Sequence, residues 1–322
     1  MLVFSGATAC APHEMDCIDP ACELTILYLL SYFELGRFVA VGDNGHVRYS
    51  QDAIQWTAAT NGTTGLQFND VAYGKGLYVA VGVSGLIAIS EKGESWLTVT
   101  SVITSNNLIG ITYNNGSFVT VGQNGEVMVS EDGQSWQQTG PGGANNNLQD
   151  VIFGNDKFVT TGALVAAPKT YSSPDGYAWT EATNAVANPL FDVSYCGGYF
   201  IAVGNSGDYQ TSADGINWNA GSQGGNWKGV ACTGNTIVGV AGGVIQYTVN
   251  GGGNWTTDSI TASVLNDVIY ADNQFVVVGY NGEIWRSISG APGTWQNVSP
   301  GGDRLDDLTF AEFYIPLQES PL

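Results

Sequence analysis

Basic residues are scarce in this chain. Its 322 residues include 9 lysines and arginines against 29 aspartates and glutamates, which gives a formal net charge of −20. Proteins that bind nucleic acids or anionic membranes draw much of their affinity from clustered Lys and Arg. The composition therefore argues against nucleic acid as a partner, and it allows membrane association only through a lipid anchor. An acidic surface of this kind is typical of a soluble, secreted protein.

Histidines and long apolar runs are also few. His13 and His46 are the only histidines, which leaves little material for a Ser-His-Asp triad or a multi-histidine metal site. The apolar run LTILYLLSYF, within residues 24–35, is too short to span a bilayer. We expect it to form a strand or a docking segment. Paired carboxylates for glycoside hydrolysis remain open, because acidic residues are many.

One repeated unit accounts for most of the chain, and residues 107–136 are its clearest copy. Apolar residues alternate there with period two, which indicates strands, and Asn-Gly pairs between them suit tight hairpin turns. The unit reads as a four-stranded antiparallel meander, with strands at residues 108–113, 118–121, 126–130 and from Trp136 onward.

The unit occurs seven times. The tryptophans that open the fourth strand recur every 37 to 43 residues, at Trp56, Trp96, Trp136, Trp179, Trp218, Trp255 and Trp295. A four-stranded unit of about 40 residues repeated in this way is the signature of a β-propeller. The sequence predicts an all-β fold with an N-terminal extension at residues 1–35 and a seven-bladed β-propeller of four-stranded antiparallel blades at residues 36–322.

Ring closure is the open point of this architecture. Blade 1 has no clear first strand, whereas residues 305–310 repeat the first-strand pattern of residues 265–270. We expect the C-terminal strand to complete blade 1, because closure removes a sheet edge. In the alternative, residues 28–33 fill that place and the C-terminal strand adds outside.

The cysteines fall into two groups. Residues 7–10, Ala-Thr-Ala-Cys, resemble a bacterial lipobox and predict lipidation of Cys10 in an exported lipoprotein. Cys10, Cys17 and Cys22 with His13 could also hold zinc, but a Cys17–Cys22 disulfide is the preferred interpretation. Cys196 and Cys232 occupy matching places in neighbouring blades, and we expect them to be buried free thiols.

The turns before the tryptophans resemble the Asp-box of bacterial neuraminidase repeats. The side chain at the third position is expected to cap backbone N–H groups, the glycine to take positive φ, and the indole to pack between blades. We therefore expect a structural role. The clearest copies are Ser130, Asp132, Gly133 and Trp136; Ser173, Asp175 and Trp179; Ser212, Asp214 and Trp218; and Thr248, Asn250, Gly252 and Trp255.

The resemblance carries two functional precedents. Sialidases of this superfamily clamp a carboxylate with three arginines, but the arginines here are only Arg37, Arg48, Arg286 and Arg304, none in an FRIP-like motif. Sialidase activity is not expected. The blade pattern is also similar to the photosystem II assembly-factor type of propeller, which implies a non-catalytic scaffold. That family docks partners partly through an arginine-rich patch, which this chain lacks the basic residues to build.

Two further features could contribute to function. Five first strands carry an aspartate, for which repetition predicts a shared bond to a backbone amide of the entering loop; a carboxylate ring that holds Ca²⁺ or a basic ligand is the alternative. These are Asp70, Asp150, Asp192, Asp267 and Asp307. The loops between blades and between strands two and three should share one face, rich in hydrogen-bonding side chains. They lie at residues 60–65, 139–147, 163–171, 181–189, 219–226 and 300–304.

Two functional hypotheses follow. The first is a non-catalytic scaffold of the bacterial cell envelope or exterior that holds a protein partner or part of an assembly. The second is a carbohydrate-binding or glycoside-hydrolysing propeller with an acidic pocket on the loop-bearing face. We expect no cofactor, with Ca²⁺ as the one alternative.

Overall fold

The computed structural model describes residues 36–312, apart from residues 61, 63, 101–103, 141–145, 164–167, 184–185 and 262. The predictions for Cys10, His13, Cys17 and Cys22 and for the apolar run at 24–35 concern residues outside this part of the chain, so they stay predictions. No helix in the described part is long and apolar enough to cross a membrane. Arg37–Ala311 forms one structural unit, and the account below concerns that unit.

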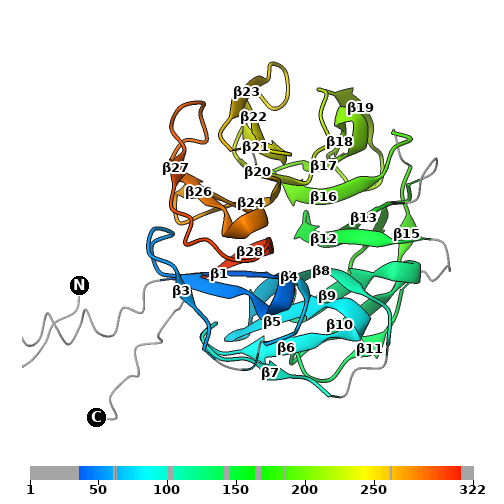
Figure 1. Ribbon diagram of the computed structural model, residues 1–322. Helices are drawn as coiled ribbons and strands as arrows, with labels where there is room; N and C mark the ends of the chain where they lie inside the picture. The colour runs from blue at the N-terminus through cyan, green and yellow to red at the C-terminus, as the bar shows by residue number, and fades with distance from the viewer. Residues whose placement is uncertain are drawn as a thin grey trace, which may run out of the picture. The chain divides into compact units, whose positions relative to one another are not determined.

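Seven four-stranded antiparallel sheets are arranged around a common centre, as Figure 1 shows. This confirms the predicted seven-bladed β-propeller. From the inner strand outward, the blades are: blade 1, β28 (Leu305–Ala311), β1 (Arg37–Gly42), β2 (Val47–Ser50) and β3 (Thr57–Ala58); blade 2, β4 (Phe68–Gly74), β5 (Leu77–Gly82), β6 (Ile87–Ser90) and β7 (Leu97–Thr98); blade 3, β8 (Leu108–Asn114), β9 (Ser117–Gly122), β10 (Val127–Ser130) and β11 (Gln137–Gln138); blade 4, β12 (Leu148–Gly154), β13 (Lys157–Gly162), β14 (Tyr171–Ser173) and β15 (Thr180–Glu181); blade 5, β16 (Leu190–Tyr195), β17 (Phe200–Gly204), β18 (Asp208–Ser212) and β19 (Asn219–Ser222); blade 6, β20 (Gly229–Thr233), β21 (Thr236–Ala241), β22 (Val244–Thr248) and β23 (Thr256–Ser259); blade 7, β24 (Leu265–Ala271), β25 (Gln274–Gly279), β26 (Ile284–Ser287) and β27 (Gln296–Asn297).

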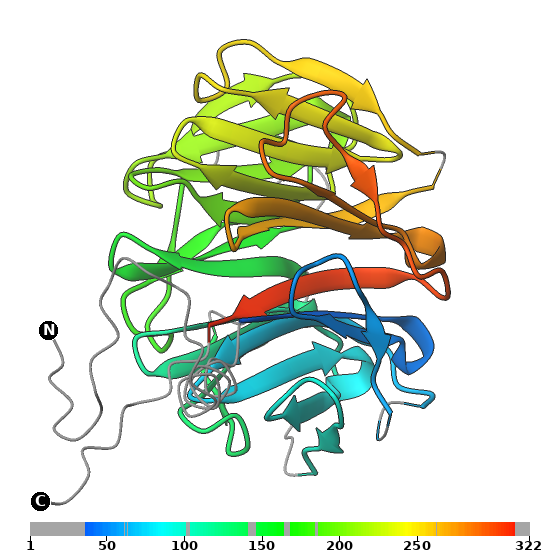
Figure 2. The same cartoon turned by 90° about the vertical axis from the view of Figure 1, so that its left-hand side faces the viewer.

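The C-terminal strand closes the ring. β28 pairs antiparallel with β1, with Phe310 opposite Phe38 and Leu308 opposite Ala40, and Figure 2 shows the two strands side by side. The rings of Phe38 and Phe310 lie 4.5 Å apart, centroid to centroid. Closure by the C-terminal strand is therefore confirmed, and the alternative, in which residues 28–33 supply this strand, is wrong.

The hairpin turns follow from their residues. Asn124 and Gly125, between strands two and three of blade 3, have φ angles of 60° and 70°. Both central residues of a two-residue hairpin turn of this type need positive φ, which Asn and Gly adopt at low cost. These residues belong to the short turn segment η3 (Gln123–Gly125). Four other blades have an equivalent segment: η1 (Asp43–Gly45), η2 (Val83–Gly85), η4 (Asn205–Gly207) and η5 (Tyr280–Gly282).

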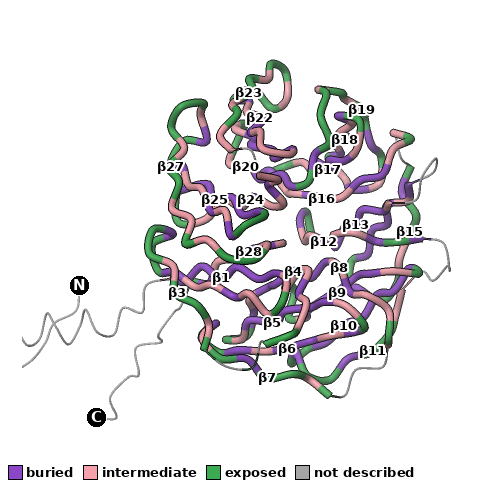
Figure 3. The backbone as a smooth tube through the Cα atoms, in the orientation of Figure 1, coloured by how far each residue is buried: buried purple, intermediate pink, exposed green. Residues whose placement is uncertain are grey.

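Apolar side chains of adjacent blades form the core. The second strands are fully buried at the aromatic position, as at Phe118, Phe158 and Phe275, and Figure 3 shows exposed residues concentrated on the outer strands and the turns. Burying one such side chain contributes about 1.5–3 kcal/mol. No blade could cover these surfaces alone, so the ring folds as one unit.

Two faces of the ring result from this topology. The turns between strands two and three meet the segments that enter strand one, as in the hydrogen bonds from Val83 N–H to the Gln67 carbonyl (3.1 Å) and from Gln123 N–H to the Asn107 carbonyl (3.0 Å). We call this side the loop face. The opposite side, the turn face, carries the turns between strands one and two and those that precede the tryptophans.

Candidate binding site at the mouth of the central channel

The inner strands place five aspartates around the central channel. At Asp70, Asp150 and Asp192 the carboxylate joins two blades, because it accepts hydrogen bonds from the residue that follows it and from the matching residue of the next blade. Asp150 accepts from Val151 N–H (2.7 Å) and from Val193 N–H (3.0 Å). Asp70 similarly reaches Ile111 N–H in blade 3.

These bonds correct one detail of the sequence prediction. The partners are backbone amides, as expected, but they belong to the first strands of the same and the next blade rather than to the entering loop. The reason is that a β-bulge at the start of strand one, between Asp70 and Phe68 for example, turns the carboxylate along the circumference of the ring. Among Arg37–Ala311, these five residues form what we call the aspartate ring: Asp70, Asp150, Asp192, Asp267 and Asp307.

Two blades have glycine in place of the aspartate, and packing explains why. A Cβ on Gly110 would lie 2.8 Å from the Cα of Asp150, and one on Gly229 would lie 2.8 Å from the Cα of Asp267. These distances leave no room for a side chain. The seam after each glycine therefore lacks a carboxylate bridge.

The environment of four carboxyls in the aspartate ring favours the protonated form. Burial, the largest effect, raises the pKa of Asp70 to about 7 and that of Asp267 to about 6. Burial followed by repulsion from neighbouring carboxylates also raises the pKa of Asp192 and Asp307 well above the ordinary value. Asp70, Asp192, Asp267 and Asp307 therefore release their protons at a higher pH than an ordinary aspartate.

The calcium alternative has no ligand set in the described residues. No group of three or more His, Cys, Asp or Glu there is arranged to hold a metal ion. Two bonds per carboxylate go to backbone amides in most of the ring, which turns the oxygens away from a common point. Asp267 differs, since its buried Oδ2 makes no hydrogen bond of normal geometry, although nearby N–H groups of Val268 and Leu308 favour its charged form.

The aspartate ring divides the channel into two chambers. The loop-face chamber has a volume of about 360 Å³. The turn-face chamber, of about 380 Å³, is lined by first-strand hydroxyl groups such as those of Tyr73, Tyr113, Tyr195 and Ser194. All five aspartates line both chambers.

The residue immediately before the aspartate position forms a second ring, around the loop-face chamber. All seven blades contribute, and the side chains differ in size, polarity and charge. We call this set the mouth ring: Asp306, Asn69, Ile109, Gln149, Phe191, Lys228 and Asn266, from blades 1 to 7 in order. The aspartate ring repeats from blade to blade, whereas the mouth ring does not.

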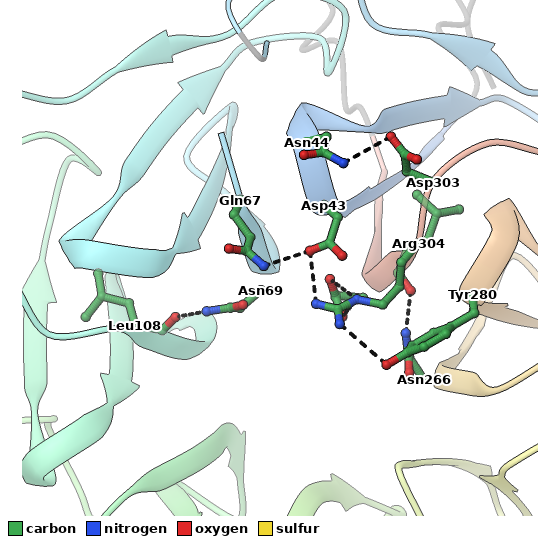
Figure 4. A network of polar contacts seen from close by, with 11 residues as sticks. Asp43, Asn44, Gln67, Asn69, Leu108, Asn266, Tyr280, Asp303 and Arg304 are labelled. Carbon is green, nitrogen blue, oxygen red and sulfur yellow. Dashed lines mark hydrogen bonds and ion pairs between the residues drawn. The ribbon is translucent and has the colours of Figure 1, made fainter. Parts of the chain in front are cut away.

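An ion-pair network surrounds the blade 1 side of the mouth, as Figure 4 shows. Arg304 contacts Asp306 at 2.8 Å and Asp43 at 3.0 Å, and its guanidinium lies 5.4 Å from the centre of the Tyr280 ring. Gln67 donates to Asp43 at 2.8 Å. Burial raises the pKa of Asp306 to about 6, against the opposing effect of Arg304. This network fixes the seam where blades 7, 1 and 2 meet.

A cation and an aromatic ring lie next to each other on the opposite side of the mouth. The ammonium of Lys228 lies 4.4 Å from the centre of the Phe191 ring, a cation–π distance. Lys228 is exposed, and it is the only basic residue among the described residues that line the loop-face chamber. The mouth is therefore asymmetric in both charge and polarity.

The Asp-box-like turns lie on the turn face, away from the mouth. In blade 3 the Ser130 hydroxyl accepts from Gly133 N–H (2.8 Å), and Asp132 accepts from Gln134 and Ser135 N–H (2.8 and 2.7 Å). Trp136 Nε1–H donates to the Gly133 carbonyl at 3.1 Å. The two backbone bonds lower the pKa of Asp132 to about 2.

The other predicted copies have related geometry. In Ser173, Asp175 and Trp179 the same bonds recur, including Trp179 Nε1–H to the Gly176 carbonyl at 2.9 Å. Ser212 and Asp214 also cap their turn, as Thr248 and Asn250 do in part. The indole N–H groups of Trp218 and Trp255 have no partner in the described residues, and Gly252 accepts a bond from Tyr209. These side chains act within their turns and do not approach the mouth.

The expectation of free thiols at Cys196 and Cys232 is wrong, because the two form a disulfide between blades 5 and 6 with a Cα–Cα distance of 5.5 Å. The register explains it. At other seams a small residue at this place packs on an aromatic residue of the next blade, and a Cβ on Gly154 would lie 2.3 Å from the Tyr195 ring. Cys196 occupies the place of that glycine and Cys232 the place of that aromatic residue, so the two sulfur atoms necessarily meet.

Sequence reasoning missed the mouth ring and a compensating pair in blade 6. Trp227 is fully buried where other blades have Leu or Phe, and a Cβ on Gly239 would lie 1.9 Å from its ring. Gly239 stands where blades 1 and 2 have alanine, so the glycine makes room for the indole. Aligning the seven blades residue by residue would have revealed both features.

Comparisons with known proteins support the fold alone. No protein-family model and no curated protein sequence matches the chain. Among solved structures, "YCF48 bound to D1 peptide" matches with a TM-score of 0.57 and 16% identity over 83% of this chain and 86% of that one. The WD40 β-propeller domain of Doa1 matches with a TM-score of 0.57 and 16% identity over 75% and 85%. A computationally designed protein, Ika8, gives 0.60 and 11% over 85% and 87%.

Proposed function

We propose that the protein is a non-catalytic propeller that holds a segment of a protein partner at the mouth of its channel on the loop face. The observation that carries this proposal is the mouth ring. In an internally repeated chain, positions that serve packing recur from repeat to repeat, as the aspartate does in five of the seven blades. Seven side chains of six types around one cavity, beside that ring, are the pattern of a binding site.

The size and chemistry of the chamber support binding of a peptide segment rather than catalysis. A cavity of about 360 Å³ is at the small end of ligand pockets, so it accepts one or two side chains. Most of its carboxylates are engaged: four of the aspartate ring accept bonds from backbone amides, and Asp306 pairs with Arg304. A solved propeller of similar fold is described as bound to a peptide, which makes this use of the fold a reasonable precedent.

The proposed location is the bacterial cell envelope or exterior. The Cys196–Cys232 disulfide supports it, because such bonds persist in oxidising compartments. The net charge of −20 suits an exported soluble protein. A lipid anchor at Cys10 and kinship with Asp-box propellers, supported by the local geometry of the turns, belong to the same proposal.

Affinity isolation with the full chain tests the proposal. The tagged protein is compared with an Ile109→Arg variant, which places a long side chain in the mouth, and with a Tyr177→Arg variant on the turn face, where Tyr177 is exposed. We expect a stoichiometric protein partner with the wild type and with Tyr177→Arg, and its loss with Ile109→Arg. Equal recovery with all three proteins would contradict the proposal.

Carbohydrate binding is the second candidate, favoured by the three amide side chains and the aromatic Phe191 in the mouth ring. Two of these amides already donate to backbone carbonyls, Asn69 to Leu108 at 2.6 Å and Asn266 to Leu305 at 2.8 Å. Binding on a glycan array that Ile109→Arg abolishes, without a protein partner, would establish this candidate in place of the first.

A further inference from the structure

We propose that the mouth ring selects a partner segment that carries a basic side chain next to a large apolar one. This inference rests on the proposed function and deepens it by naming the chemistry of the segment. The loop-face chamber accepts the basic side chain, and the apolar side chain packs on the blade 3 to blade 5 side of the mouth.

The order of side chains around the mouth defines two sides. Blades 3 and 5 contribute Ile109 and Phe191, with Gln149 between them, so this side offers apolar contact area. Blades 7, 1 and 2 contribute Asn266, Asp306 and Asn69, which are polar or acidic. A segment that satisfies both sides needs an apolar and a polar side chain close together in its sequence.

The charge of the lining favours a cation over an anion as the polar group. Six aspartates line the chamber, against Lys228 as the one basic residue among the described lining. Asp267, which lines the floor, also has an Oδ2 that makes no hydrogen bond of normal geometry among the described residues. A cationic guest would stabilise the ionised form of these buried carboxyls, whereas a carboxylate guest would find a favourable charge only at Lys228, whose ammonium lies over Phe191.

Lys228 has a second consequence for specificity. An exposed cation at the rim of an acidic chamber repels a basic guest that approaches on the blade 6 side. It therefore directs the basic side chain toward the opposite half of the ring, where Asp306 and Asn69 lie. The replacement Lys228→Ala should strengthen binding of a basic segment, an effect that damage to the fold would not produce.

The test uses a random 12-residue peptide library displayed on phage and selected on the full chain. We expect the enriched peptides to share a Lys or Arg next to a large apolar residue. Synthetic copies should bind Gln149→Glu at least tenfold more tightly than Gln149→Lys, since no hydrogen bond of Gln149 is lost in either variant. Phe191→Ala should weaken binding about tenfold, whereas its matched control on the turn face, Tyr177→Ala, should leave binding unchanged.

The outcomes separate the two proposals. Peptides that lose affinity with Phe191→Ala but have no basic residue, or that prefer Gln149→Lys, would overturn the inference and leave the mouth as the binding site. Peptides that bind wild type and Phe191→Ala equally would place binding elsewhere and overturn the proposed function as well. A library that yields no enriched peptide would also overturn the inference.

Discussion

Loss of the disulfide between blades 5 and 6 should destabilise the whole ring. Cys196 and Cys232 are 36 residues apart, and in the chain-entropy model a loop of this length contributes about 4 kcal/mol to the free energy of unfolding. Other contacts of the seam would remain, because Val230 N–H donates to Asp192 there and Trp227 is buried in the apolar cluster between the two blades. Opening this seam would expose the apolar residues that blades 5 and 6 bury there.

Urea denaturation followed by tryptophan fluorescence measures the effect. We expect a Cys196→Ala/Cys232→Ala double variant to lose about 2–4 kcal/mol relative to wild type, where the lower value allows for structure that remains in the unfolded chain. Wild type treated with a reductant should unfold at the same lower urea concentration. As a control, reductant should not change the midpoint of the double variant.

Chemical mapping of the cysteines shows whether the disulfide is present and can refute this reasoning. Under non-reducing conditions, proteolysis and mass spectrometry should recover a linked peptide pair that contains Cys196 and Cys232. Alkylation of both thiols in the folded protein without prior reduction, together with an unchanged midpoint in the double variant, would refute the reasoning. It would also remove the main support for an oxidising location.

Two other predictions concern stability. Asp70 and Asp267 have pKa values raised to about 7 and about 6, so they stabilise the fold most when they are protonated. The free energy of unfolding should therefore rise by a few kcal/mol as pH falls from 8 to 5. A free energy of unfolding that instead falls steadily over this range, measured by urea denaturation, would contradict the pKa assignments. Below pH 4 stability should fall again, because Asp132 has a lowered pKa of about 2 and loses its capping bonds on protonation. Gly239→Ala should lower the free energy of unfolding by about 1–3 kcal/mol, because the added methyl group overpacks against Trp227. Trp227→Leu in the same chain should restore much of this loss, since leucine and alanine fill these places elsewhere in the ring. Additive losses in the double variant would show that the two residues are not coupled.

The fold could be predicted from sequence because its signals are local and repeated seven times. The alternation in residues 118–121 and the Asn124-Gly125 turn each specify a strand or a hairpin, and repetition removes the ambiguity of a single copy. Closure was also accessible, because residues 305–310 repeat the first-strand pattern of other blades. These features depend on backbone geometry and period rather than on contacts between distant residues.

The candidate site was less accessible because it depends on register between blades. The sequence identified the repeated aspartates but not that the preceding residues face one chamber, since a β-bulge in strand one decides which side chains turn inward. The disulfide was missed for a related reason. The expectation that Cys196 and Cys232 occupy matching places is wrong, because they are one place apart in the repeat, and only the contact between Gly154 and Tyr195 at another seam shows that these two places touch.

Site-specific photo-crosslinking tests the central claim, that the mouth of the channel holds a protein segment, most directly. A photoreactive phenylalanine analogue is placed in the full chain at Gln149 in the mouth, or at Tyr177 on the turn face, and the cells that produce the protein are irradiated. We predict one protein adduct from position 149, absent from position 177, with the crosslinked peptide carrying a Lys or Arg beside a large apolar residue. Adducts from position 177 alone would contradict the account.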